Sequence, residues 1–412
     1  MFYSLSPDVY LVKGVSRGCL YDFNHSKLYN LNHNLVDFID QINNGNYEST
    51  APFQSEQQVI LDEMIALGLI TVRENPEHHD IQELRRNDFQ CRFAWIEITN
   101  KCNLRCIHCY NESNIQATKV MSYENYKLVL DSLIRLGVQK IQIIGGEPFF
   151  YRNLLKEMLT YTIGKVPFIE IFTNGTLIPD VWFAFLARNH IHIALSVYSY
   201  VSDMHDKVTQ CKGSWERTNG TIRKLKEYHI PYRVCNVLMK GINLGKKDTD
   251  LYTLRKDKDV ARMSGRANFN LLSDNLIRKR LITKNNFRYP ISKNFCQKLV
   301  SGHNCFADKI YISADLTVYP CVMERRFNHD LVSKDQGIIL KRNILELNKD
   351  SIQDCSKCEY RYCCFDCRPN SLSGAIYEKP WYCTYNPYIG KWTPEDIFIL
   401  QLKKKWGNSD DR

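Results

Sequence analysis

Three cysteines lie close together in the segment TNKCNLRCIHCYNES, directly after the apolar-alternating run FAWIEIT. Cys102, Cys106 and Cys109 are separated by three and then by two residues. Positions i, i+4 and i+7 share one side of a helix, so a buried helix face is one explanation for this spacing. The residues between the cysteines are mostly polar, which argues against such a face.

Metal binding explains the three thiols better. Structural zinc normally takes four protein ligands. His108 could be the fourth, but it is adjacent to Cys109, which makes tetrahedral closure awkward. Thiolates also bind the irons of four-iron clusters, and three of them leave one iron without a protein ligand. We therefore predict an iron–sulfur cluster whose open iron binds a small molecule and passes it an electron.

The composition of the chain is consistent with metal binding in a reducing compartment. The chain has 412 residues, 16 cysteines and a formal net charge of +10. Disulfide frameworks belong to short secreted chains, whereas this chain is long and begins without an export signal. It also lacks a run of about 18 apolar residues. These features predict a cytoplasmic protein with no membrane span, and the basic residues show no pattern specific to nucleic acid.

The elements that must position the cysteines follow from the hydrophobic pattern. Between residues 91 and 285, strand-like runs alternate with helical runs, which predicts a parallel sheet with crossover helices, closed or partly closed as a barrel. Chemistry in such a fold lies at the carboxyl ends of the strands. Both the cysteine triplet and a Gly-Gly-Glu-Pro turn (Gly145, Gly146, Glu147) follow predicted strands there.

The triplet and the turn together resemble the radical S-adenosylmethionine (SAM) enzymes. The resemblance implies an α/β fold with a partial (β/α)6 TIM-like barrel and SAM chelated by the open iron. His108 then lies near the adenine, and Gly145, Gly146 and Glu147 bind the SAM amino group. In the same family Asn174, in FTNGTL, closes the third strand, and Ser196, in LSVYS, reaches the methionyl or ribose groups. Many relatives have Asp-Gly where this chain has Tyr198 and Ser199, which leaves that contact open.

Nine further cysteines lie in the carboxyl-terminal part of the chain. A single zinc ribbon would leave at least five of them unused. Their order, with VYPC, CSKC, CCFDC and WYC, resembles the SPASM extension of radical SAM peptide-modifying enzymes, although Leu316 replaces the glycine usual in the hairpin before Pro-Cys. The resemblance implies two auxiliary clusters, one held by Cys296, Cys305, Cys321 and Cys367, the other by Cys355, Cys358, Cys363 and Cys383. Cys364 is the alternative to Cys363, which we prefer because it keeps the CxxxC spacing to Cys367.

The first 85 residues predict a separate unit of short strands followed by helices. It resembles the winged-helix-like domain that recognises leader peptides in ribosomal peptide maturation, above all in the grasp-with-spasm maturases. A structural cap on the barrel is the alternative. The predicted organisation is 1–85 for leader recognition, 91–285 for the barrel, 290–390 for the SPASM domain and 391–412 for a terminal helix and tail.

These resemblances imply a radical SAM enzyme that modifies a ribosomally made precursor peptide, forming thioether or carbon–carbon cross-links. Its cofactors would be SAM and three [4Fe–4S] clusters, and its partners the precursor peptide and an electron donor such as flavodoxin or ferredoxin. No catalytic base follows from the spacing. The alternatives are a maturase of protein substrates, of the sulfatase-maturating type, and a non-catalytic iron–sulfur or zinc scaffold that binds peptides.

Overall fold

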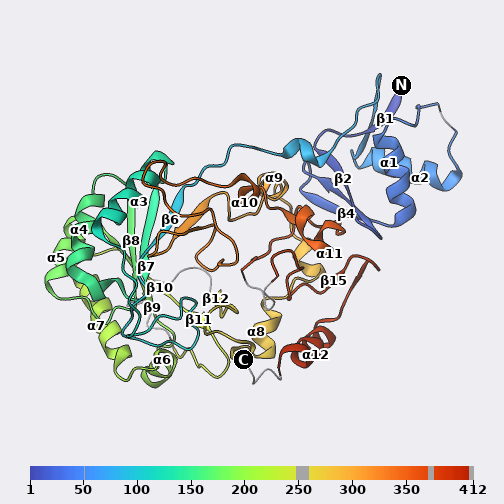
Figure 1. Cartoon of the computed structure of the whole chain (residues 1–412). Coiled ribbons are helices and arrows are strands. Elements are labelled where there is room, and N and C mark those ends of the chain that lie inside the picture. Colours follow the sequence, from blue (N-terminus) through green and yellow to red (C-terminus); the bar gives the residue numbers. More distant parts are fainter. Residues whose placement is uncertain (51, 247–258, 370–374, 408–412) are drawn as a thin grey trace.

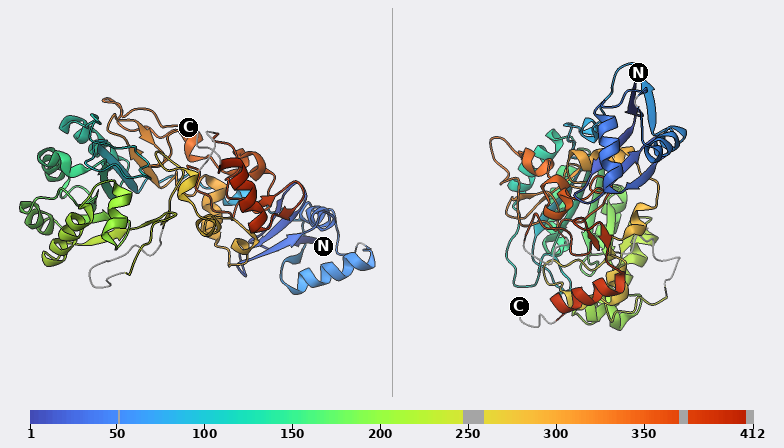
Figure 2. Two further views of the ribbon diagram at one scale, coloured as in Figure 1. Left: turned by 90° about the horizontal axis from the view of Figure 1, so that it is seen from below. Right: turned by 90° about the vertical axis from the view of Figure 1, so that its right-hand side faces the viewer.

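The computed structural model describes residues 1–50, 52–246, 259–369 and 375–407. The chain forms three parts in a row: a barrel at one end, the cysteine-rich region in the middle and the amino-terminal domain at the other end (Figures 1 and 2). The amino-terminal domain therefore does not cap the barrel. Among the described residues, no helix has both the length and the apolar character that a membrane crossing requires.

A seven-stranded sheet with the order β10-β9-β8-β7-β6-β13-β14 forms the barrel wall. All neighbours are parallel except β13 and β14, which are antiparallel. The strands are β6 (Phe93–Thr99), β7 (Lys140–Gly145), β8 (Phe168–Thr173), β9 (His192–Ser196), β10 (Tyr232–Cys235), β13 (Lys309–Ile312) and β14 (Val318–Tyr319). The predicted partial barrel with six parallel strands is thus present. Its sixth strand, β13, comes from the cysteine-rich region and pairs with β6, at the opposite side of the sheet from β10.

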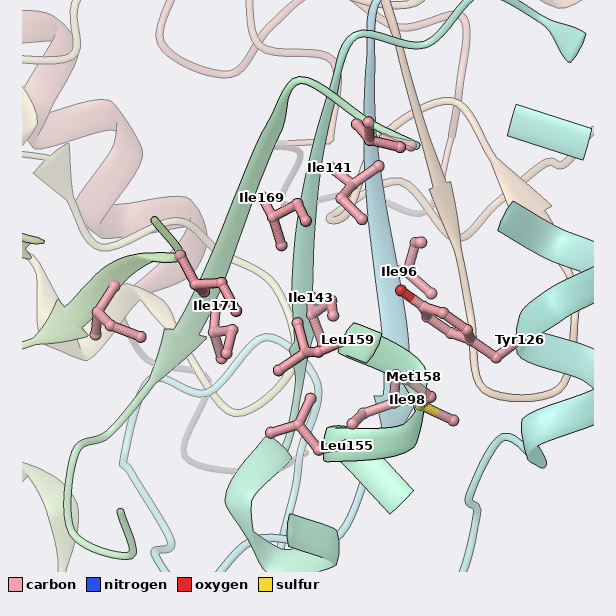
Figure 3. Close-up of a cluster of buried hydrophobic side chains, with 14 of the residues drawn as sticks. Ile96, Ile98, Tyr126, Ile141, Ile143, Leu155, Met158, Leu159, Ile169 and Ile171 are labelled. Carbon is pink, nitrogen blue, oxygen red and sulfur yellow. The ribbon is translucent and has the colours of Figure 1, made fainter. Parts of the chain in front are cut away.

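Helices cover the outer face of this sheet (Figure 1). They are α3 (Tyr123–Arg135), α4 (Arg152–Thr162), α5 (Val181–Arg188), α6 (Ser202–Thr209) and α7 (Ser214–Glu227). Alternate strand residues, such as Ile96 and Ile143, pack against helix residues such as Tyr126 and Leu159 in one buried cluster (Figure 3). Because successive strand residues face opposite sides, the remaining positions point into the barrel. Several of these are polar, including Glu97, which is 3% exposed.

The amino-terminal domain has a three-stranded antiparallel sheet, a two-stranded sheet and two helices. Its elements are β1 (Phe2–Leu5), β2 (Val9–Lys13), β3 (Gly18–Asp22), β4 (Lys27–Leu31), α1 (His33–Asn43), α2 (Ser55–Ala66) and β5 (Ile70–Arg73). The hairpin of β2 and β3 and both helices match the prediction. The strands β1, β4 and β5 were not predicted, because each has only four or five residues.

One face of the three-stranded sheet packs on α1, and the other packs on the cysteine-rich region. The Tyr21 hydroxyl donates to the Glu359 carbonyl at 2.9 Å, and the Val15 N–H donates to the Lys357 carbonyl at 3.0 Å. Tyr21, Tyr360 and Tyr362 share a buried cluster. This contact fixes the amino-terminal domain to the segment that carries most of the later cysteines.

The cysteine-rich region has short elements joined by turns. They are α9 (Lys293–Ser301), α10 (Arg342–Leu345), α11 (Gln353–Ser356), β15 (Tyr385–Asn386), β16 (Lys391–Trp392) and the terminal α12 (Glu395–Trp406), with the 3-10 turn η5 (Lys349–Ser351). The segment between β10 and α9 contains β11 (Val237–Leu238), β12 (Asp259–Val260), η3 (Phe269–Leu271), α8 (Asp274–Arg278) and η4 (Lys284–Phe287), while η1 (Ile81–Leu84) precedes β6 and η2 (Pro148–Tyr151) follows β7. The hairpin of β13 and β14 and the terminal helix match the prediction. Leu316, which stands where relatives have glycine, has a φ of 70° and occupies the left-handed region that favours glycine.

Candidate functional site

The cysteine triplet lies in the loop that follows β6, at the carboxyl end of the barrel strands. Cys102 is buried, and burial, Glu147, Cys106 and Cys109 all raise its pKa. Burial and Cys109 raise the pKa of Cys106 to about 12. The three thiols thus act on one another electrostatically. We name Cys102, Cys106 and Cys109 the first thiol group.

A distant segment fixes the shape of this loop. The Arg266 guanidinium donates to the Cys106 carbonyl at 2.9 Å and to the Ser113 carbonyl at 3.0 Å, and the Arg266 N–H donates to the Cys109 carbonyl at 3.0 Å. A Cβ at Gly265 would lie 2.3 Å from the Cys109 carbonyl oxygen, so glycine is needed for this approach. Sequence reasoning missed both residues, because nothing in the segment SGR indicates a partner about 160 residues away.

The glycines of the Gly-Gly-Glu-Pro turn pack against the start of the same loop. A Cβ at Gly145 would lie 2.3 Å from the Thr99 carbonyl oxygen, and one at Gly146 would lie 2.2 Å from the Lys101 carbonyl oxygen. The Gly146 N–H donates to the Thr99 carbonyl at 2.7 Å. The turn after β7 therefore holds the cysteine loop through its backbone, and larger residues do not fit there.

Glu147 is fully buried, and its carboxylate joins the ends of two strands. It accepts from the Thr173 hydroxyl at 2.7 Å and 2.9 Å, from the Asn174 N–H at 2.8 Å and from the Phe149 N–H at 3.0 Å. Burial raises its pKa to about 7, against the opposing effect of these hydrogen bonds. The carboxylate therefore anchors the turn to the end of β8.

Asn174 connects this anchor to the first thiol group. Its side-chain amide lies 3.8 Å from the Cys102 sulfur and donates to the Asn103 side-chain oxygen at 3.0 Å. Its backbone N–H is bonded to Glu147, as described above. The structure therefore brings Glu147, Asn174 and Cys102 into one continuous network.

His108 and Ser196 meet through Tyr198. The His108 ring lies 4.6 Å from the Tyr198 ring, edge to face, and Ser196 lowers the pKa of Tyr198, against the effect of burial. Burial lowers the pKa of His108 to about 4, so its imidazole is neutral, and its Nδ1 is buried without a hydrogen-bond partner. Cys106 also acts on the pKa of Tyr198. The residue that stands in place of the usual Asp is thus part of the site, beside the cysteines.

Polar side chains also line the inner face of the barrel, and we name Glu97, Tyr311 and Arg325 the polar wall. The Tyr311 hydroxyl donates to Glu97, and the Arg325 guanidinium lies over the Tyr311 ring at 3.9 Å. Burial raises the pKa of Glu97, with Tyr311 and Arg325 opposing the shift. Burial, then Glu97 and Cys109, raise the pKa of Tyr110, which places Tyr110 between the wall and the first thiol group. A polar interior suits a substrate that has amide groups to be bound.

The later cysteines form two further sets. Burial, Cys367 and Cys305 raise the pKa of Cys321 to about 12, with Arg262 opposing the shift. We name Cys305, Cys321 and Cys367 the second thiol group. Cys296, which we predict as its fourth ligand, acts on Cys363 and lines one cavity with Cys363, Cys364 and Cys367.

Cys364 belongs to the last set. Burial and Cys364 raise the pKa of Cys383 to about 11, and Cys364 also raises the pKa of Cys355 and Cys358. We name Cys355, Cys358, Cys364 and Cys383 the third thiol group. Cys363, which we prefer over Cys364 from the spacing, donates to the Tyr360 carbonyl at 3.4 Å, and Tyr21 acts on its pKa. The two adjacent thiols have different neighbours, and both line one cavity.

These groups fit iron–sulfur clusters better than single metal ions. Among the described residues, no three His, Cys, Asp or Glu side chains converge on a point that could hold one ion. Cluster cysteines bind separate irons, so they stand farther apart than the ligands of one zinc. A cavity of about 460 Å³ is lined in part by Cys296, Cys363, Cys364 and Cys367.

The larger cavity, of about 660 Å³, lies elsewhere. It is lined by residues at the amino ends of β8 to β10, among them Phe168, His192 and Tyr232. Chemistry in barrels occurs at the other end of the strands, where the cysteine loop lies.

Comparisons with known proteins agree with this site. Residues 96–252 match the model of the radical SAM superfamily. The subtilosin biosynthesis protein AlbA of Bacillus subtilis is 34% identical over 170 residues, which are 40% of this chain and 38% of AlbA. A GTP 3′,8-cyclase of Petrotoga mobilis is 29% identical over 175 residues, 40% of this chain and 52% of the cyclase. The chain thus spans about half the length, or less, of these curated relatives.

Solved structures extend the likeness of the fold to nearly the whole chain. SuiB of Streptococcus suis superimposes with a TM-score of 0.51 at 15% identity, covering 93% of this chain and 100% of SuiB. The SuiB structure with bound S-adenosylmethionine gives 0.52 at 14% identity, covering 91% and 99%. The cysteine loop, the glycine turn and the family match coincide on the same strands. The chain therefore contains a radical SAM domain, at residues 96–252.

Proposed function

We propose that this protein is a radical SAM enzyme that cross-links a ribosomally made precursor peptide. The observation that carries the proposal is the first thiol group, three mutually close cysteines held by Arg266 beside the glycine turn. When bound there, a [4Fe–4S] cluster supplies the electron that breaks SAM into methionine and a 5′-deoxyadenosyl radical. AlbA, which is similar over the barrel, is named for the biosynthesis of a bacteriocin, which supports a peptide as substrate.

The residues around the first thiol group would bind and orient SAM. Gly145, Gly146 and Glu147 would bind its amino group, and the bonds of Glu147 to Thr173 and Asn174 keep the turn in place. The neutral His108, with its unpartnered Nδ1, would face the adenine, and Ser196 the ribose or methionyl groups. The polar wall of Glu97 and Tyr311 would contact the peptide.

The second thiol group, with Cys296 as its fourth ligand, and the third thiol group would hold two auxiliary [4Fe–4S] clusters. In this proposal Cys364, not Cys363, is the ligand of the third group. Closing a thioether removes one hydrogen atom from a peptide carbon, to the 5′-deoxyadenosyl radical, and one proton from the peptide thiol. The electron left over when the carbon–sulfur bond forms would pass to an auxiliary cluster. An external electron donor would serve the first cluster.

The amino-terminal domain would bind the leader of the precursor peptide. Strand β5 pairs with β1 on one side, and no other described strand pairs with it. Val72 on β5 and Val59, Ile65 and Leu67 on or next to α2 are large apolar side chains exposed by 38% or more. An unpaired edge beside apolar side chains suits β-addition by a disordered leader.

The test uses the anaerobically reconstituted protein, SAM, dithionite and the short peptide encoded beside this gene. A cross-link shows in mass spectrometry as the loss of two hydrogens from the peptide, and tandem fragmentation locates it. Modification of a folded protein instead, with none of the peptide, would favour a maturase of protein substrates. SAM cleavage without any peptide or protein product would contradict the proposal.

A further inference from the structure

Lys349 is a buried cation inside the third thiol group. It is 6% exposed, at the start of η5, and its ammonium donates to the Cys364 carbonyl. A buried ammonium is costly unless an anion lies close by. The anion that balances the buried charge of Lys349 therefore bears on the chemistry of the third thiol group.

The buried carboxylate of Asp366 already has other partners. Asp366 accepts from Arg368 at 2.7 Å and from His303 at 3.0 Å. No carboxylate of the described residues lies within ion-pair distance of Lys349. Its ammonium instead lies at the Cys364 carbonyl, so the anion that a bound cluster would bring closest to it is the cluster with its thiolates.

Other charges near this group are more remote from the thiols or compensated. Lys379 is 26% exposed and lies 3.8 Å from Asp354. Glu359 accepts from the Tyr385 hydroxyl, and burial raises its pKa, which favours its neutral form. Arg368 is also buried, but it pairs with Asp366, whereas Lys349 has no carboxylate partner among the described residues.

A cation fixed beside a cluster favours the more negative of its two redox states. A four-thiolate [4Fe–4S] cluster gains one negative charge when it takes up one electron, and net charge and hydrogen bonds set its potential. We propose that Lys349 is the charge partner of the cluster held by Cys355, Cys358, Cys364 and Cys383 and raises its reduction potential. The inference rests on the proposed function. A higher reduction potential would make this cluster a better acceptor for the electron released when the cross-link forms.

The test compares three variants of the full chain in a background that carries Cys102→Ala, Cys106→Ala and Cys109→Ala, so that only auxiliary clusters remain. Lys349→Met removes the buried charge, and Lys349→Arg keeps it. Lys357→Met removes an exposed charge next to Cys358 and serves as the matched control. Iron content is measured first, and dithionite titrations followed by electron paramagnetic resonance then give the midpoint potentials.

We expect Lys349→Met to make one auxiliary midpoint potential more negative, while Lys349→Arg and Lys357→Met match the background protein. Loss of one cluster in Lys349→Met but not in Lys349→Arg would also support a charge role. Unchanged potentials in Lys349→Met, or equal changes in Lys349→Met and Lys349→Arg, would overturn the inference. A background protein without auxiliary clusters would instead overturn the proposed function.

Discussion

The adjacent residues Cys363 and Cys364 have different neighbours in the structure. Cys363 lies against Tyr21 of the amino-terminal domain, whereas Cys364 acts on Cys355, Cys358 and Cys383. The CxxxC spacing to Cys367 favoured Cys363, but spacing along the chain does not determine the direction of a side chain in a loop.

We predict that Cys364→Ala loses the iron of one cluster, about four atoms per chain, because a four-iron cluster depends on its full set of thiolates. Cys363→Ala is the matched control and should retain its iron, since its thiol faces Tyr21. Iron and sulfide analysis of the reconstituted variants measures both. Retention of iron in Cys364→Ala together with loss in Cys363→Ala would restore the assignment based on spacing.

Single residues also show why sequence reasoning found only part of the site. The cysteines, Gly145, Gly146 and Glu147 were predictable because their types and local spacing carry the chemistry. Arg266 and Gly265 were not, because their roles exist only once a distant segment packs on the cysteine loop. The anchoring role of Glu147 was also not predictable, since its partners lie on the next strand.

At the scale of elements, the ends of β6 and β7 must approach closely for the site to form. The backbone around Gly146 leaves no room for a side chain beside Lys101. By contrast, Gly220 lies within α7, and a Cβ there would meet no atom within 4 Å.

We therefore predict that Gly146→Ala destabilises the barrel by roughly 1–3 kcal/mol through overpacking and lowers 5′-deoxyadenosine formation. Gly220→Ala should be neutral or stabilise by about 0.5–1 kcal/mol, because alanine favours a helix over glycine. Thermal unfolding followed by circular dichroism measures the difference. Equal unfolding temperatures in the two variants would show that the turn does not depend on close approach.

Helices and strands with a clear hydrophobic periodicity were predicted well, whereas strand pairings that depend on tertiary packing were not. The strands and main helices of the barrel followed from alternation and helical spacing. The predicted hairpin at 309–319 is present, but its first strand joins the barrel sheet beside β6, which no local pattern indicates. Strand pairing between segments about 200 residues apart is decided by packing of the whole sheet.

At the scale of the whole molecule, the cysteine-rich region joins the barrel to the amino-terminal domain. Strand β13 belongs to the barrel sheet, and the buried tyrosines around Tyr360 hold the amino-terminal domain. A leader bound at the far end would therefore leave the rest of a peptide free to reach the barrel across the cysteine-rich region.

We predict that Val72→Asp weakens binding of the candidate precursor peptide about tenfold, a cost of roughly 1.4 kcal/mol, because a charge would be buried beside the added strand. Val181→Asp is the control, since Val181 is 81% exposed on α5 of the barrel. Fluorescence polarisation with a labelled peptide measures both. Equal affinities would exclude the β5 edge as the leader site.

The account depends most on the first thiol group, and SAM cleavage tests it most directly. The reconstituted protein is incubated anaerobically with SAM and dithionite, and 5′-deoxyadenosine is quantified by chromatography. We expect formation by the native chain, formation close to the native level in Cys19→Ala, and none in Cys106→Ala. No 5′-deoxyadenosine from the native chain even with a peptide substrate, or equal formation in Cys106→Ala and the native chain, would contradict the account.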